Sequence, residues 1–280
     1  MIAARPDLLI VGGLTVDHLA DGSIAPGGSV LHAARAVAAA GWRVSTVTAA
    51  GSEAAARAGL GELAATGPMR ARRVRHSISF AIEEADGWRR LVTESVGSAV
   101  SATDVRATAD DAAAVLLAPV AGEISAAVLL ASAAAPVRVA ALQGWLRELS
   151  PGQQVQPRPL SALGATLSGA LAAMDLLVAS DEDLAAIGAD PDHRLDALRA
   201  QFGPRPLLVV TTGERGVLLD DPADGRRHLA AGERVEGVST IGAGDALAGL
   251  LAAGLGARMR PLAALTAAQA GTVTYLRSRP

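Results

Sequence analysis

Short apolar runs alternate with longer alanine-rich stretches along most of the chain. A run such as Leu8–Val11 carries no polar residue, which is typical of a strand buried on both faces of a parallel sheet. A stretch such as Ser29–Ala40 is long enough for a helix. Strands are predicted at Leu8–Val11, Val44–Thr48, Ala114–Leu117, Val137–Ala141, Leu176–Val178, Leu207–Val210 and Val217–Leu219. Helices are predicted at Ser29–Ala40, Glu53–Ala65, Glu123–Ala131, Ser161–Ala173, Glu182–Ile187, Leu195–Gln201, Ala243–Leu255 and Pro261–Leu276.

This alternation predicts an α/β fold in which helices cover both faces of a mainly parallel sheet. One segment interrupts it: Ile78–Glu84, the turn Ala85-Asp86-Gly87 and Trp88–Thr93 predict a hairpin. We expect that hairpin to be a flap or an extension of the sheet. A second D-G pair, Asp224-Gly225, predicts a late hairpin, and Gly152–Pro159 predicts a loop.

Composition excludes several kinds of chemistry. The chain has 280 residues and no Cys, so thiolate metal sites and Cys nucleophiles are excluded. All 25 basic residues are Arg, so the chain contains no P-loop or Schiff-base lysine. The net charge of -3 and the 2% aromatic content argue against nucleic-acid or anionic-membrane partners. The first seven residues contain no apolar signal core, and we expect a cytoplasmic protein.

The segment Ser239-Thr240-Ile241-Gly242-Ala243-Gly244-Asp245 is the sharpest chemical feature. Two glycines and a small residue open a predicted helix, where backbone N–H groups and the helix dipole favour an anion. Asp245 would stand beside that anion, where it could accept a proton from an attacking hydroxyl. A simple capping role for Asp245 is the alternative that this segment alone leaves open.

A second glycine pair, Gly27-Gly28, opens the helix after the first strand. Asp17 lies shortly before it, on what the pattern predicts to be a loop at the carboxyl end of that strand, where open α/β sheets bind ligands. Taken alone, Asp17 could be a solvated loop residue, and His32 a histidine of the helix surface or core.

Four ordered segments together resemble the ribokinase-like (PfkB-type) carbohydrate kinases, over nearly the whole chain. They are Gly12…Asp17…Gly27-Gly28…His32, Ser180-Asp181-Glu182-Asp183, Val210-Thr211-Thr212-Gly213-Glu214-Arg215-Gly216 and Thr240-Ile241-Gly242-Ala243-Gly244-Asp245. The resemblance implies a single kinase domain over residues 1–280, built as a three-layer αβα sandwich with a small β lid. It also implies ATP-dependent transfer of the γ-phosphoryl group, with Mg²⁺, to a hydroxyl of a sugar or polyol.

The resemblance assigns roles residue by residue. Asp245 would be the general base, and Gly242, Ala243 and Gly244 the anion hole. Asp17, Gly28 and His32 would bind the acceptor. Thr211, Gly213 and Ser180 would lie by the nucleotide, and Asp183 and Glu182 would act on Mg²⁺, through waters.

Two further segments, Ala118–Ile124 and Ala141–Arg147, resemble the myo-inositol-kinase-like branch, in which Gln143 and Arg147 would donate to the acceptor. A loop role for Gln143 and a helix-surface role for Arg147 stay open. A nucleoside acceptor and a non-catalytic nucleotide- or sugar-binding sensor also remain as alternatives.

Several positions depart from the family pattern. They are His32 and Ser180 in place of Asn, Ser239 and Ala141 in place of Asp, and Asp183 in place of Glu. Only about ten residues separate Asp17 from Gly27, so we expect little chain there for lid strands and a lid reduced to the 78–93 hairpin. The edge of that hairpin is a candidate homodimer contact.

Overall fold

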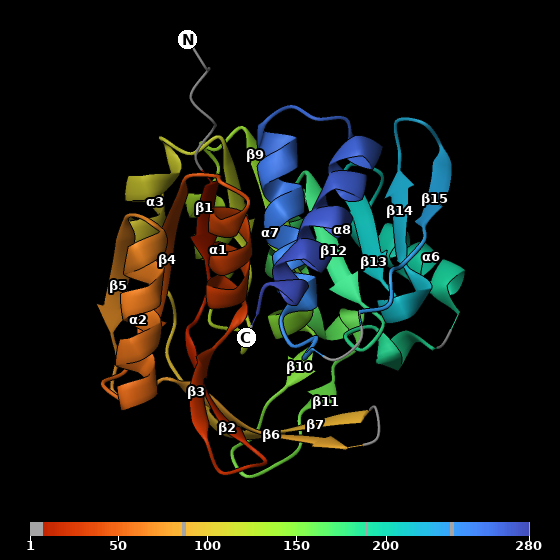
Figure 1. The fold of residues 1–280 in the computed structure, drawn as a ribbon. Helices are drawn as coiled ribbons and strands as arrows, with labels where there is room; N and C mark the ends of the chain where they lie inside the picture. The colour runs from red at the N-terminus through yellow and green to blue at the C-terminus, as the bar shows by residue number, and fades with distance from the viewer. Residues whose placement is uncertain (1–7, 86–87, 189, 236–237, 280) are drawn as a thin grey trace.

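A central sheet of nine strands forms the body of the protein in the computed structural model, which describes residues 8–85, 88–188, 190–235 and 238–279 (Figure 1). The strand order is β15-β14-β13-β12-β9-β8-β1-β4-β5. The strands from β5 to β13 run parallel, and β14 and β15 add an antiparallel edge. These strands are β1 (Leu8–Val11), β4 (Val44–Ala50), β5 (Met69–Arg73), β8 (Ala114–Leu117), β9 (Val137–Ala141), β12 (Leu176–Ser180), β13 (Leu207–Thr211), β14 (Val217–Asp221) and β15 (Arg226–Ala230).

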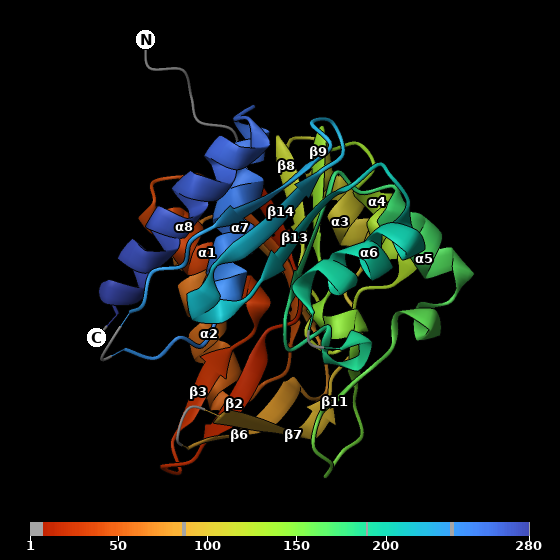
Figure 2. The same ribbon diagram turned by 90° about the vertical axis from the view of Figure 1, so that its right-hand side faces the viewer.

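Helices cover both faces of this sheet, as the alternation predicts (Figure 2). One face carries α1 (Ser29–Ala39), α2 (Ala54–Thr66), α7 (Ala243–Gly256) and α8 (Pro261–Arg277), and the other carries α3 (Ala102–Ala109), α4 (Ala126–Ala131), α5 (Ala165–Ala172) and α6 (Pro191–Phe202). Successive residues of β1 alternate between the two cores, since Leu8 and Ile10 pack on one face and Leu9 and Val11 on the other. The predicted three-layer α/β fold is confirmed.

A second sheet lies beyond the carboxyl ends of the parallel strands, at the bottom of Figure 1. Its order is β3-β2-β6-β7. The strands are β2 (Thr15–Leu19), β3 (Ile24–Gly27), β6 (Ile78–Ala85) and β7 (Trp88–Val96). The 78–93 hairpin is therefore confirmed, although Asp86 and Gly87 of its expected turn lie outside the described residues. We call this four-stranded sheet the lid.

The expectation of little lid chain between Asp17 and Gly27 was wrong. The segment forms both β2 and β3, and β2 pairs in parallel with β6. Asp17 accordingly lies on a strand rather than on a loop. The outer edge of β7 is also partly covered, because Thr93 N–H donates to Gln153 O at 2.9 Å and Val155 N–H donates to Leu91 O at 2.9 Å. The candidate dimer contact at that edge stays a prediction, and the edge offers fewer unpaired backbone groups for it than expected.

Three predicted helices are shorter or broken. The helix expected from Glu123 begins only at Ala126, because the Glu123 side chain is buried against backbone N–H groups. The one expected over 182–187 reduces to a 3₁₀ turn, Ala185–Ile187. The one expected over 161–173 is interrupted at Gly164, whose φ of 69° separates a 3₁₀ turn from α5. Arg147 lies on a short strand, β10 (Arg147–Glu148), which pairs with β11 (Gln156–Pro157) inside the expected loop.

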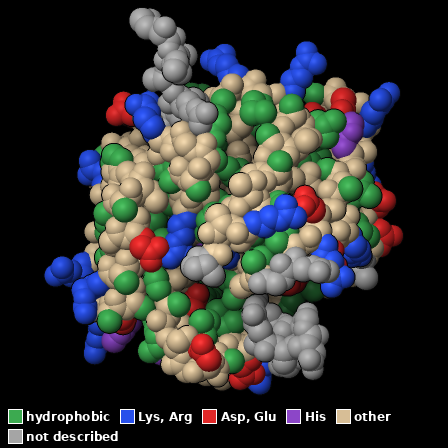
Figure 3. Space-filling model, viewed as in Figure 1, with side chains coloured by type: hydrophobic (Ala, Val, Ile, Leu, Met, Phe, Trp, Pro, Cys, Tyr) green, Lys and Arg blue, Asp and Glu red, His purple; other side chains and the backbone are tan. Residues whose placement is uncertain are grey.

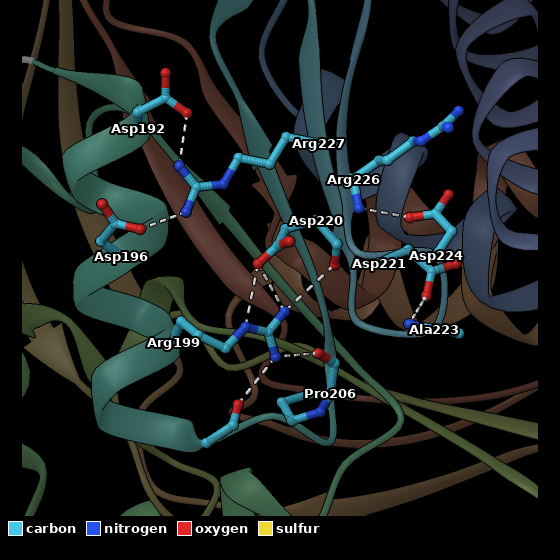
Figure 4. A network of polar contacts seen from close by, with 11 residues as sticks. Asp192, Asp196, Arg199, Pro206, Asp220, Asp221, Ala223, Asp224, Arg226 and Arg227 are labelled. Atoms are coloured by element: carbon cyan, nitrogen blue, oxygen red, sulfur yellow. Dashed lines mark hydrogen bonds and ion pairs between the residues drawn. The ribbon is translucent and has the colours of Figure 1, made fainter.

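Two arginines join the antiparallel edge to α6 (Figure 4). Arg199 donates to the Asp220 carboxylate at 2.8 Å from Nη2 and to the carbonyl oxygens of Gly203 and Pro206 at 2.9 Å. Arg227 donates to Asp192 at 2.7 Å and pairs with Asp196 on the same helix. These contacts hold the β14–β15 hairpin against the body, where it borders the cavity described below.

Candidate active site

One cavity of about 660 Å³ lies between the lid and the carboxyl ends of the parallel strands. Figure 3 shows a hollow in that region, bordered by hydrophobic side chains in green. The volume is in the range of small-molecule sites. Every site residue predicted from the sequence lines it: Asp17, Gly28, His32, Gln143, Arg147, Ser180, Glu182, Asp183, Thr211, Gly213, Gly242, Ala243, Gly244 and Asp245. Segments far apart in the sequence thus meet at one place, as parallel topology requires.

The amino terminus of α7 opens into this cavity. Gly242 is the N-cap with a left-handed φ of 77°, and Asp245 is half-buried in the first turn. The N–H groups of a helix's first turn have no partner within the helix, so this end can receive an anion. Ala243 N–H, however, donates to Thr240 O at 3.0 Å. The N–H of Ala243 would have to break this hydrogen bond before it could contribute to an anion hole. Gly244 has open space beside it, because a Cβ there would meet no atom within 4 Å.

Gly242 is required by packing as well as by its backbone angle. A Cβ at this position would lie 2.3 Å from Cγ of His32 on α1. α1 and α7 also meet at Gly249, where a Cβ would lie 2.9 Å from a Val37 methyl carbon. Small residues therefore let the two helices approach each other, and the His32 ring lies directly against the turn that opens α7.

Asp17 reaches the cavity from the lid. Its side chain is 7% exposed, and it accepts a hydrogen bond from the Thr15 hydroxyl at 2.8 Å. A Cβ on Gly27 would lie 2.0 Å from an Asp17 oxygen, and a Cβ on Gly28 would lie 2.5 Å from Gly13 O. The glycine pair is thus explained by close approach of β3 and the start of α1 to β2. The solvated-loop alternative for Asp17 was wrong.

Gln143 and Arg147 form a polar pair in the wall of the cavity. With its amide oxygen turned toward Arg147, Gln143 accepts from Arg147 Nη1 at 2.7 Å. The amide NH₂ of Gln143 can then donate to a ligand oxygen. Arg147 Nη1 also donates to Val120 O at 3.5 Å, and Val120 packs against Ile78, Phe80 and Ile82 of the lid.

The carboxylate of Asp183 closes a turn at the end of β12. It accepts from Ser180 N–H at 3.0 Å and from the Ser180 hydroxyl at 2.7 Å. One Asp183 oxygen is therefore occupied by the protein, and the neighbouring Glu182 is exposed at the cavity wall. Within the described parts of the chain, no three His, Asp or Glu side chains gather as a metal cage. The Glu182 carboxylate at the cavity wall is the kind of group that can hold Mg²⁺ together with waters and substrate phosphates.

The turn after β13 forms another part of the wall. Thr212 closes it, because its hydroxyl and its N–H both donate to Gly216 O, at 2.8 and 2.9 Å. Gly213 has a φ of 58°, and a Cβ there would meet open space. Gly213 therefore presents backbone to the cavity without an obstructing side chain, which suits contact with a phosphate or a nucleotide, and Thr211 lines the cavity beside it.

Sequence reasoning missed several parts of the wall. The inner face of the lid contributes Phe80, Ile82 and Leu91, and their alternation along the strands was the available signal. α8 contributes Gln269, Thr272, Val273 and Leu276, which share a helix face at spacings of three and four. The segment after β15 contributes Gly232, Glu233 and Val235.

Next to the segment that leads into the lid strand β2 lies a buried carboxylate, Glu123, with 4% of its surface exposed. It accepts N–H bonds from Gly13 at 2.7 Å, from Val120 at 3.1 Å and from Ala121 at 2.8 Å. Burial raises the pKa of Glu123 above its ordinary value of 4.5, and these N–H bonds act in the opposite direction. Glu123 thus connects the loop that follows β8 to the segment that leads into β2.

Comparison with known proteins agrees with this geometry. Solved structures with the same fold include a pyrophosphate-dependent kinase of the ribokinase family, complexed with a pyrophosphate analog and myo-inositol. It has a TM-score of 0.81 and 17% identity, over 98% of this chain and 96% of that one. A ribokinase from Arabidopsis thaliana, complexed with ribose and ATP, has a TM-score of 0.74 and 17% identity, over 99% and 94%.

No curated protein matches the sequence significantly. No helix among the described residues is long and apolar enough to cross a bilayer. The family model of the pfkB carbohydrate kinases matches residues 10–274, which is nearly the whole chain. The chain therefore belongs to the pfkB family of carbohydrate kinases, phosphotransferases that act on sugar hydroxyls.

Proposed function

We propose that this protein transfers the γ-phosphoryl group of ATP to a hydroxyl of a sugar or cyclic polyol. The observation that carries the proposal is the position of Asp245. This carboxylate lies in the first turn of α7, beside Gly242 and Gly244, in the same cavity as the lid residue Asp17. A proton acceptor next to an anion site is what phosphoryl transfer to a hydroxyl requires.

In the proposed step, the acceptor oxygen forms a bond to the γ-phosphorus, and the bond from that phosphorus to the bridging oxygen of ADP breaks. The hydroxyl proton passes to the Asp245 carboxylate. Negative charge on the transferring group is stabilised by the N–H groups of Gly242 and Gly244, at the positive end of α7. Ala243 joins them if its bond to Thr240 opens.

The donor side of the cavity is assigned to the turn after β13 and the end of β12. Thr211, Gly213 and Ser180 would contact the donor, and Glu182 would hold Mg²⁺ through water. Asp183, whose carboxylate closes the Ser180 turn, would support Glu182 and offer at most its second oxygen to the metal. When bound, Mg²⁺ neutralises charge on the donor phosphates.

The acceptor side lies against the lid. Asp17 can accept hydrogen bonds from hydroxyls, while Gln143 and Arg147 can donate to them. Gly28 lets the backbone approach the ligand, and His32 offers a ring nitrogen. The apolar inner face of the lid suits the C–H surface of a ring. A myo-inositol-like acceptor agrees with the ligand named for the pyrophosphate-dependent relative.

A second donor, inorganic pyrophosphate, is favoured by two observations. Three of the similar structures are of pyrophosphate-dependent kinases. In addition, two exposed arginines pair with carboxylates that line the cavity: Arg215 with Asp181, and Arg234 with Glu214 at 3.3 Å. Guanidinium groups at this wall could turn toward a compact, highly charged donor.

The test is phosphoryl transfer with a panel of inositols, hexoses, pentoses and nucleosides, each offered with MgATP and with magnesium pyrophosphate. Acceptor-dependent release of ADP or phosphate supports a kinase and identifies both substrates. Turnover of nucleosides alone would replace the polyol proposal. Donor binding without turnover on any acceptor would favour a non-catalytic sensor.

A further inference from the structure

Arg279 lies two residues beyond the end of α8, and its guanidinium reaches back to the turn that opens α7. Nη1 donates to the carbonyl oxygen of Ile241 at 2.7 Å. Nη2 donates to the hydroxyl of Tyr275 at 3.0 Å and lies 3.3 Å from Nδ1 of His32. The guanidinium carbon lies 4.5 Å from the centre of the Tyr275 ring. One side chain thus connects three separate segments of the chain.

Arg279 is held in this position by its own helix. Tyr275 is buried, and it precedes Arg279 by four residues. A guanidinium that both approaches an aromatic ring and bonds to its hydroxyl has little freedom to rotate. The contact with Ile241 is therefore a fixed support rather than a loose surface bond.

The contacts bear on the proposed anion hole. Ile241 immediately precedes Gly242, whose left-handed φ of 77° aims the first N–H groups of α7. The His32 ring lies against Gly242 on the other side, so close that a Cβ would be 2.3 Å from its Cγ. Arg279 touches both Ile241 and His32, and it holds the turn and the ring against each other.

The same contact determines which nitrogen of His32 carries the hydrogen. A guanidinium only donates, so Nδ1 of His32 must be the acceptor. In a neutral imidazole, Nε2 then carries the N–H. His32 lines the cavity, and this tautomer makes its Nε2 a donor toward ligand oxygens.

We propose that Arg279 is a positioning residue for phosphoryl transfer. It holds the Ile241–Gly242 turn in the geometry of the anion hole, and it fixes His32 as the Nε2–H tautomer that donates to a substrate oxygen. This inference rests on the proposed function, because it assigns Arg279 a part in the same reaction.

The kinetic test compares Arg279→Met with Arg277→Met. Arg277 lies at the end of the same helix, but its side chain is 58% exposed and pairs with Glu233 rather than with the turn. We expect kcat of Arg279→Met to fall about 10- to 100-fold, because small displacements of a preorganised site are costly. Arg277→Met should keep the kcat of the wild type, and the two variants should have the same melting temperature. Arg279→Lys, which can reach one partner but lacks the planar fork, should be intermediate in kcat.

A second measurement does not depend on turnover. The chain has five histidines, so nitrogen-15 spectra at about pH 8, where imidazoles are neutral, can be assigned with His32→Gln. We expect His32 of the wild type to be the Nε2–H tautomer and to become a mixture in Arg279→Met. A wild-type Nδ1–H tautomer, or a spectrum that Arg279→Met leaves unchanged, would overturn the inference.

The two measurements separate the failure of this inference from that of the proposed function. If the wild type turns over and Arg279→Met matches Arg277→Met, the positioning role is wrong and the kinase proposal stands. If the wild type turns over no acceptor, the kinase proposal fails, and the catalytic role of Arg279 fails with it. The histidine spectrum still decides whether Arg279 sets the state of His32.

Discussion

Replacing Glu123 by Gln tests how the loop after β8 is tied to the segment that leads into β2. The wild-type carboxylate accepts from three N–H groups through four contacts: Oε1 receives Gly13 N–H at 2.7 Å and Val120 N–H at 3.1 Å, and Oε2 receives the same Val120 N–H at 3.2 Å and Ala121 N–H at 2.8 Å. A glutamine has the same shape but only one acceptor oxygen. Whichever way the amide turns, either Gly13 or Ala121 loses its partner and faces an NH₂ group.

The magnitude follows from that single loss. A buried N–H without an acceptor costs about 1–3 kcal/mol. The substitution also removes a buried charge, which offsets part of this cost. We therefore expect the free energy of unfolding to fall by about 1–2 kcal/mol. Because Gly13 leads into β2, the variant should also bind the acceptor more weakly, with a raised KM.

The pH dependence has a definite sign. Burial raises the pKa of Glu123 in the folded state above its ordinary value of 4.5. Between that value and the raised one, the folded state binds more protons than the unfolded state, so the contribution of Glu123 to stability falls as pH rises. Gln does not titrate. The stability difference between the wild type and Glu123→Gln should therefore shrink as pH rises through this window and stay constant above it.

Urea unfolding at a series of pH values measures both effects. Glu148→Gln, at an exposed position, is the matched control and should unfold like the wild type. Equal stability of Glu123→Gln and the wild type would refute the hydrogen-bond argument. A difference that grows as pH rises would refute the assigned direction of the pKa shift.

Three further changes test the site and its support. Gly242→Ala should lower kcat about 10- to 100-fold because it displaces the turn, whereas Gly225→Ala, at a φ of 64° with open space around it, should leave steady-state kinetics unchanged. Arg199→Met should lower the free energy of unfolding by about 1–3 kcal/mol in urea titrations, while Arg205→Met, at an exposed pair, should change it little. Asp17→Asn should raise KM for the acceptor about 10-fold with a smaller change in KM for the donor, and equal effects on both would contradict its place on the acceptor side.

The layered fold could be predicted because its signals are local. Strands such as Leu8–Val11 are buried on both faces, and helices such as α7 and α8 follow clear glycine and proline starts. α3 was missed although it carries a capping signal, since Ser101 accepts from Asp104 N–H at 3.2 Å. β5 was missed because it is an arginine-rich edge strand, with the polar surface that discourages pairing with other chains.

The site residues could be predicted because they follow motifs in a fixed order, and all of them meet at one cavity. The remainder depends on tertiary contacts that no local pattern contains. β2 and β3 are short and hold Asp17, Pro26 and Gly27, so their strand character arises from the pairing of β2 with β6 and of β3 with β2. Arg279 has no motif at all, and its contact with His32 spans 247 positions of the chain.

The most direct test of the central claim is the turnover of Asp245→Asn beside the wild type, with each protein's donor affinity measured in parallel. The account predicts acceptor-dependent turnover in the wild type, a kcat lower by about 10²- to 10⁴-fold in Asp245→Asn, and an unchanged Kd for the donor. Near-normal turnover of Asp245→Asn would show that this carboxylate is not the base, and would contradict the account.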